Sequence, residues 1–179
     1  MLRPSVFRVP HLRFPRQKSK QELYQTYVNV LRDRAARAQE LLARQNDAFD
    51  LLPKKQIMAL CLDESMTARK ELMVSCRSNK ALASIGNAQL STSVALKCYR
   101  ERASAQRYQE IRDTRCTQAA KAELFDSWFK GEAVILHWSF ETAETTTRQK
   151  ADFVDALIGL LVLTGQTILA EWLCAKIAK

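Results

Sequence analysis

The chain is poor in the residues that interrupt regular structure. Among its 179 residues there are four glycines and four prolines, and no proline follows Pro53. The dipeptides Asn-Gly and Asp-Gly, which favour tight turns between strands, do not occur. Sheet proteins need frequent turns, so the sequence predicts an all-α fold in which long helices are joined at few breaks.

Residues that carry most enzyme chemistry are also scarce. The only histidines are His11 and His137, and neither the Cys-x-x-Cys nor the His-x-x-x-His spacing of a zinc site is present. Four widely separated glycines cannot form a phosphate-binding loop. The acids Asp152 and Asp155 share one face of a predicted helix, where we expect them to help cap its start. We therefore predict no catalytic residue, no metal, no cofactor and no enzymatic activity.

Cysteines are too few and too irregular for a disulfide framework. They number five, an odd count, at Cys61, Cys76, Cys98, Cys116 and Cys174. Such spacing fits a reducing compartment and small buried apolar side chains.

A long apolar run is absent as well. A membrane-spanning helix needs roughly 20 apolar residues. The most apolar stretch, residues 156–170, contains Gln166 and is followed by Glu171. It is better explained by two antiparallel helices that turn at Gly165. A membrane span over residues 153–175 is the less favoured alternative.

The positive charge is concentrated at the N-terminus. The formal net charge is +9, but residues 1–20 hold six Lys or Arg and no acid, which leaves the remainder near neutral. An Arg-rich, acid-free segment with interspersed apolar residues is typical of a mitochondrial presequence. We predict a targeting extension over residues 1–20, disordered or removed, and a location on the matrix side. The alternative is a basic arm that threads into a large assembly.

Hydrophobic periodicity predicts one helical domain over residues 21–179. Ser19 and Glu22 form a capping box for its first helix, and Pro53 fits the first position of the second. The expected helices cover residues 20–50, a segment after Pro53, a short segment between 79 and 86, and residues 90–111, 117–130, 133–140 and 148–163, with a last helix after Gly165. Of these, 133–140 is the one segment that could instead be a strand. Thr145, Thr146 and Thr147 can cap the helix that follows them.

The segment 153–177 resembles one pentatricopeptide (PPR) repeat. That family has a Leu-Ile pair in its first helix, a glycine at the turn, an alanine where the helices cross and an apolar residue near the end. The matching residues are Leu157, Ile158, Gly165, Ala170 and Ile177. The resemblance implies an all-α, PPR/TPR-like irregular array of antiparallel hairpins, with one hairpin at residues 148–178. One repeat cannot read RNA, because such repeats bind about one base each.

In outline the chain is similar to the small PPR-related accessory subunit on the F1 part of ATP synthase in euglenozoan mitochondria. This resemblance implies a non-catalytic subunit that packs against a larger protein of a mitochondrial complex. Large aromatic residues are candidate interface anchors, namely Trp128, Phe129, Trp138, Phe140 and Trp172. One alternative is a ribosomal or RNA-binding protein that uses Arg100, Arg102, Arg107, Arg112 and Arg115 on phosphates. The other is a membrane-anchored subunit of a respiratory complex.

Overall fold

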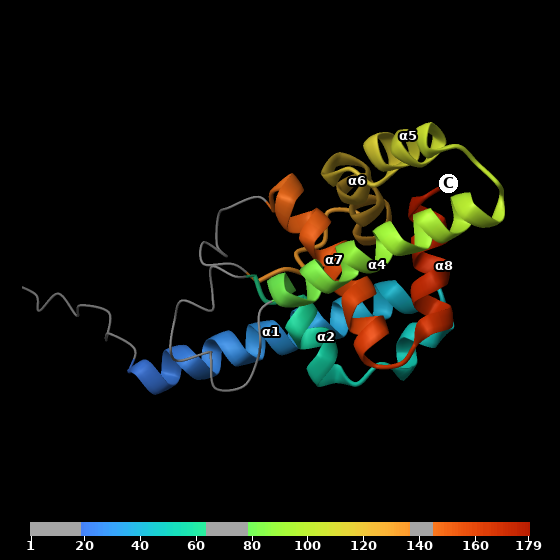
Figure 1. Cartoon of the computed structure of the whole chain (residues 1–179). Coiled ribbons are helices and arrows are strands. Elements are labelled where there is room, and N and C mark those ends of the chain that lie inside the picture. Colours follow the sequence, from blue (N-terminus) through green and yellow to red (C-terminus); the bar gives the residue numbers. More distant parts are fainter. Residues whose placement is uncertain (1–18, 64–78, 137–144) are drawn as a thin grey trace, which may run out of the picture.

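The computed structural model describes residues 19–63, 79–136 and 145–179. These residues form seven α-helices and one 3₁₀ helix, with no strand, so the all-α prediction is confirmed (Figure 1). The predictions made for residues 1–18 and for His137, Trp138 and Phe140 lie outside the described residues.

The first helix, α1 (Lys20–Ala43), begins as predicted. The backbone N–H of Glu22 donates to Ser19 Oγ at 3.2 Å, and that of Ser19 donates to Glu22 Oε2 at 2.6 Å. The helix ends short of the predicted residue 50 because Asn46 starts a separate 3₁₀ helix, η1 (Asp47–Leu51), by accepting from the N–H of Ala48. Helix α2 (Lys54–Leu60) follows, with Pro53 as its N-cap and not as its first residue.

The predicted break at Gly86 is wrong. Helix α4 (Asn79–Arg100) runs through Gly86 without interruption. The predicted continuous helix 90–111 is wrong too, because α4 stops at Arg100 and α5 (Ala105–Arg115) starts at the N-cap Ser104. Between the two helices Arg102 takes a left-handed conformation with φ of 52°.

Helix α6 (Gln118–Phe129) agrees with its prediction. Thr117 caps its start, and Lys130 and Gly131 end it with positive φ. The helix predicted for 133–140 is wrong over its described part, since residues 133–136 are not helical. Leu136 instead makes an isolated parallel bridge to Leu62, in which its N–H donates to the carbonyl of Cys61 at 2.7 Å.

The last two helices are α7 (Thr147–Leu163) and α8 (Thr167–Ile177). Thr146 caps α7 through a reciprocal capping box with Gln149, which confirms the predicted cap. At the other end Gly165 has φ of 74°, and the N–H of Gln166 donates to the carbonyl of Leu161 at 2.8 Å. This is the Schellman arrangement, in which a left-handed glycine closes a helix. The chain turns at Gly165 as expected, and α8 runs back beside α7 (Figure 1).

Helix α7 lies at the centre of the molecule, in contact with α2, α4, α6 and α8. Its most extensive contact is with α4, where two glycines let the backbones meet. A Cβ added to Gly86 would lie 1.7 Å from the carbonyl oxygen of Asp155, and one added to Gly159 would lie 2.1 Å from that of Leu82. Each helix therefore needs glycine at the crossing.

Candidate protein-interaction surface

Helix α4 has a second face, directly opposite the one that packs on α7. Its exposed residues recur at spacings of four and three, at Ala81, Ile85, Ala88, Thr92, Ala95 and Tyr99. We refer to these six residues as the outer face of α4. The spacing is that of the a and d positions of a heptad, with which one helix packs along another. At 1.5 Å per residue, the outer face is about 27 Å long.

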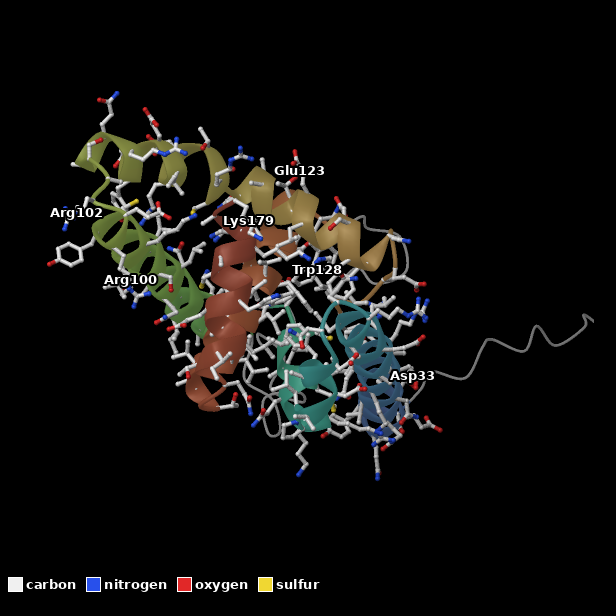
Figure 2. All side chains as sticks on the ribbon, turned by 90° about the vertical axis from the view of Figure 1, so that its right-hand side faces the viewer. Asp33, Arg100, Arg102, Glu123, Trp128 and Lys179 are labelled. Atoms are coloured by element: carbon white, nitrogen blue, oxygen red, sulfur yellow. The ribbon has the colours of Figure 1, made fainter. Side chains whose placement is uncertain are left out.

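The outer face is unusual because it carries no charge. From Ala81 through Leu96 the helix contains no Asp, Glu, Lys or Arg. The exposed sides of other helices are charged, with Arg32 and Asp33 on α1, Arg107 on α5, and Glu123 on α6. In Figure 2 the labelled Asp33 and Glu123 lie on the outside of the molecule. A helix face that meets water is normally charged or strongly polar, so the outer face has the composition of a face that is covered.

Apolar exposure increases toward the C-terminal end of this surface. Tyr99 is 84% exposed and Leu96 is 48% exposed. A groove of about 280 Å³ lies between α4 and α8, lined among others by Leu96, Lys97 and Ala175. The surface available to a partner thus continues from the outer face of α4 into this groove.

Positively charged side chains lie at the junction of α4 and α5. Arg100 and Arg102 are exposed at this corner, where Figure 2 labels both of them. Arg107 pairs with Glu110 at 3.1 Å, and Arg112 donates to Ser91 and to Tyr108. Two of the five arginines named for phosphate binding are therefore engaged within the protein.

The aromatic anchors predicted from sequence lie mainly in the core. Trp128 is 3% exposed and Phe129 is fully buried, while Trp172 is partly buried. The rings of Trp128 and Trp172 stack with centroids 6.4 Å apart, and Lys176 Nζ lies 5.2 Å from the Trp172 centroid. These described aromatic residues join α6 to α8.

The residues that carry the resemblance to a PPR repeat occupy structural positions. Leu157, Ile158, Ala170 and Ile177 are buried, and Gly165 forms the turn. Whether they belong to a repeat stays a prediction, since the most extensive contact of α7 is with α4 and not with α8.

The described cysteines are wholly or partly buried. Burial raises the pKa of the thiols of Cys61, Cys116 and Cys174, which disfavours the nucleophilic thiolate. No group of His, Cys, Asp and Glu that could hold a metal ion occurs in the part of the chain that the structure describes. Asp155 does not cap α7 as expected, because it is buried and pairs with Lys121 at 2.7 Å.

The fold and this surface define an all-α protein with an uncharged, exposed helix face. Comparison of the chain with protein-family models, with curated proteins and with solved structures gives no match. Among the described residues, no helix has the length and apolar character needed to cross a bilayer.

The described aromatic residues predicted as anchors do not mark the surface that the structure exposes. The sequence does contain a signal for this surface, because one helix carries two different residue patterns. Leu90, Val94 and Cys98 mark a buried stripe, while an uncharged heptad stripe runs on the opposite side from Ala81 to Tyr99. A helix without charge on either side is expected to be covered on both.

Proposed function

We propose that this chain is a non-catalytic helical adaptor, an accessory subunit of a mitochondrial multiprotein complex, which docks on a larger subunit through the outer face of α4. The observation that carries the proposal is the exposed, uncharged heptad stripe from Ala81 to Tyr99. The proposed mitochondrial location is inferred from the basic segment 1–20. The resemblance described in the sequence analysis suggests the F1 part of ATP synthase as the complex.

Physical considerations support docking of a helix on this face. Alanine and threonine at heptad positions let a second helix approach closely, while Ile85, Leu96 and Tyr99 supply apolar area for burial. Self-association is disfavoured because α4 carries Lys80, Lys97 and Arg100 and no acid. Two copies would bring like charges together in either orientation.

The proposal is tested by placing a charge on the outer face. Ala88→Arg should remove the chain from its complex, because a buried guanidinium without a counter-charge costs several kcal/mol. Tagged full-length protein would be purified from its own cells in mild detergent, and the size of the assembly measured on native gels. Ala36→Arg is the matched control, since Ala36 is an exposed alanine within α1.

The expected result is a large assembly with the wild type and with Ala36→Arg, and a free monomer with Ala88→Arg. Both variants should keep the circular dichroism of the wild type. Recovery of the wild type as a free monomer would refute the adaptor function. Full assembly by Ala88→Arg would refute the role of this face.

RNA binding is the second candidate, favoured by the exposed Arg100 and Arg102 at the junction of α4 and α5. Phosphate contacts weaken steeply with salt, so retention of RNA on filters should fall as salt rises. The double variant Arg100→Glu, Arg102→Glu should abolish that retention. Equal retention by this variant would eliminate RNA binding at the corner.

A further inference from the structure

Positive charge is unevenly distributed after the N-terminal segment 1–20. Residues 79–116, which include α4 and α5, hold seven Lys or Arg and three acids, a net charge of +4. Residues 21–78 and 117–179 together hold 15 Lys or Arg and 16 acids, a net charge of −1. The positive surplus of this part of the chain is therefore located on the helix that carries the outer face and on the helix that follows it.

The cations begin where the uncharged part of the outer face ends. Residues 81–96 contain no charged residue, and Lys97, Arg100 and Arg102 follow. Arg100 and Arg102 are exposed, and Figure 2 shows both at the C-terminal end of α4. Neither of them forms an ion pair with any residue that the structure describes. Two unpaired guanidinium groups thus lie at one end of the outer face.

Acids close to these cations do not remove the surplus. The groove between α4 and α8 is lined by Lys97, Arg100, Glu101 and Glu171, so the charge of its lining is balanced. Arg102 lies outside this lining and leaves the junction of α4 and α5 positive. A carboxylate that approaches the junction from outside would meet Arg100 and Arg102. Guanidinium and carboxylate groups form strong pairs, often through two parallel hydrogen bonds.

The length and composition of the outer face select a helix as its occupant. About 27 Å of α4 would accept about 18 residues of a second helix. The small side chains of Ala81, Ala88 and Ala95 would let that helix approach closely. RNA carries phosphates at regular intervals, so it would need cations along the stripe, where residues 81–96 offer none. A second copy would bring the cations of α4 against one another.

We propose, on the basis of the docking function proposed above, that the partner segment is an amphipathic helix with an acidic end. Its uncharged seam covers the outer face of α4, and its Asp or Glu side chains at one end pair with Arg100 and Arg102. Complementary charges at the edge of an interface speed association and fix the register of the two helices. The apolar stripe supplies the buried area, and the acids determine how the partner is placed along it.

The proposal is tested by reversing the two charges. Tagged full-length Arg100→Glu, Arg102→Glu would be purified from its own cells and compared with the wild type on native gels. The ratio of assembled to free protein should fall at least about tenfold, which corresponds to about 1.4 kcal/mol. Arg100→Lys, Arg102→Lys keeps both charges and should assemble as the wild type does. Arg32→Glu, Lys55→Glu reverses two exposed cations on α1 and α2 and is the matched control.

The lysine variant also reveals the partner's carboxyl groups directly. A water-soluble carbodiimide joins a lysine amine to a carboxyl group as an amide, with loss of water and without a spacer. After treatment of the assembled Arg100→Lys, Arg102→Lys protein, mass spectrometry should find residue 100 or 102 linked to an Asp or Glu of a larger subunit. The linked residue should lie at one end of a segment with an uncharged heptad stripe. The wild type, with arginine at both positions, should give no such link.

The outcomes separate this proposal from the docking function itself. Full assembly by Ala88→Arg would refute docking on the outer face. Loss of assembly by Ala88→Arg, with full assembly by Arg100→Glu, Arg102→Glu, would leave the docking face in place and refute the acidic partner. Release of the wild type by ribonuclease would show that RNA is the occupant, and an assembly with the mass of two copies would show self-association. Either of these results, or the absence of links to a carboxyl group of a larger subunit, would overturn the proposal.

Discussion

Replacing Gly86 by alanine should destabilise the protein, although it improves the helix propensity of α4. The propensity gain of alanine over glycine in a helix is about 1 kcal/mol. This gain is opposed by a steric clash, because the new Cβ would lie 1.7 Å from the carbonyl oxygen of Asp155. Real Cβ atoms essentially never make contacts shorter than 3.0 Å. The clashing atom belongs to the backbone of α7, so the two helices must separate by more than 1 Å.

Overpacking of this kind usually costs about 1 to 3 kcal/mol, and occasionally more. Separation of α4 from α7 is expected to reach the upper part of that range, since this is the most extensive helix contact in the described molecule. After the propensity gain is subtracted, we expect Gly86→Ala to lower the free energy of unfolding by about 2 kcal/mol. Gly159→Ala should have a similar effect, because its Cβ would lie 2.1 Å from the carbonyl oxygen of Leu82.

Urea unfolding followed by circular dichroism measures these changes. Ala88→Gly is the control, since Ala88 is on the exposed outer face of the same helix and should lose only the propensity difference of about 1 kcal/mol. The double variant Gly86→Ala, Gly159→Ala should cost less than the sum of the single variants, because one separation of the helices relieves both clashes. A more stable Gly86→Ala protein would refute the close crossing.

Further predictions concern the ion pair and the helix ends. Lys121→Met leaves Asp155 buried without its partner, and should lower the free energy of unfolding by about 3 to 5 kcal/mol in urea titrations. Burial raises the pKa of Asp155 above its usual value, so ionisation of this carboxyl group disfavours folding. Lowering the pH from 7 toward 4 should therefore stabilise the wild type relative to Asp155→Asn. The opposite trend would show that attraction to Lys121 exceeds the cost of burial. Arg102→Gly should raise the melting temperature, because a non-glycine residue with φ of 52° is strained by roughly 1 kcal/mol. Thr146→Ala should cost about 1 kcal/mol through loss of the cap of α7, and an unchanged urea midpoint would argue against that cap.

Local signals predicted three helix ends correctly. The capping boxes at Ser19 and Thr146 and the turn at Gly165 depend on residues within a few positions of each other. Their hydrogen bonds form in the same way whatever the rest of the fold does. These features could therefore be found from sequence alone.

The errors have a different physical origin, since each depends on a distant partner. Gly86 suggested a helix break, but its function is the contact with α7, which becomes visible only when Gly159 is placed beside it. Residues 133–136 are apolar enough for a helix, yet Leu136 pairs with Leu62. Arg34 of α1 also donates to the carbonyl of Ile135. Neither pairing has a signature in the local sequence.

The candidate surface could be predicted only in part, for a related reason. Aromatic residues serve equally in cores and at interfaces, and Trp128 and Phe129 prove to be core. The ion pair of Lys121 with Asp155 was not predicted either, because the two residues lie on different helices. Their convergence requires the tertiary arrangement of α6 and α7.

The residues on the two faces of α4 are subject to different constraints. Only the constraint on the inner face is imposed by folding. Its inner face must carry Gly86 so that the helix can meet α7. On the outer face, charged residues would change stability by no more than about 0.5 kcal/mol, and Lys or Glu would keep the helix propensity. Folding therefore does not account for the absence of charge from Ala81 through Leu96. The proposed coverage by a partner would account for it, because a charge buried there would lose its hydration without gaining a counter-charge. Since contact with α7 already fixes α4 in place, a partner would meet a preformed surface and lose little free energy in ordering it.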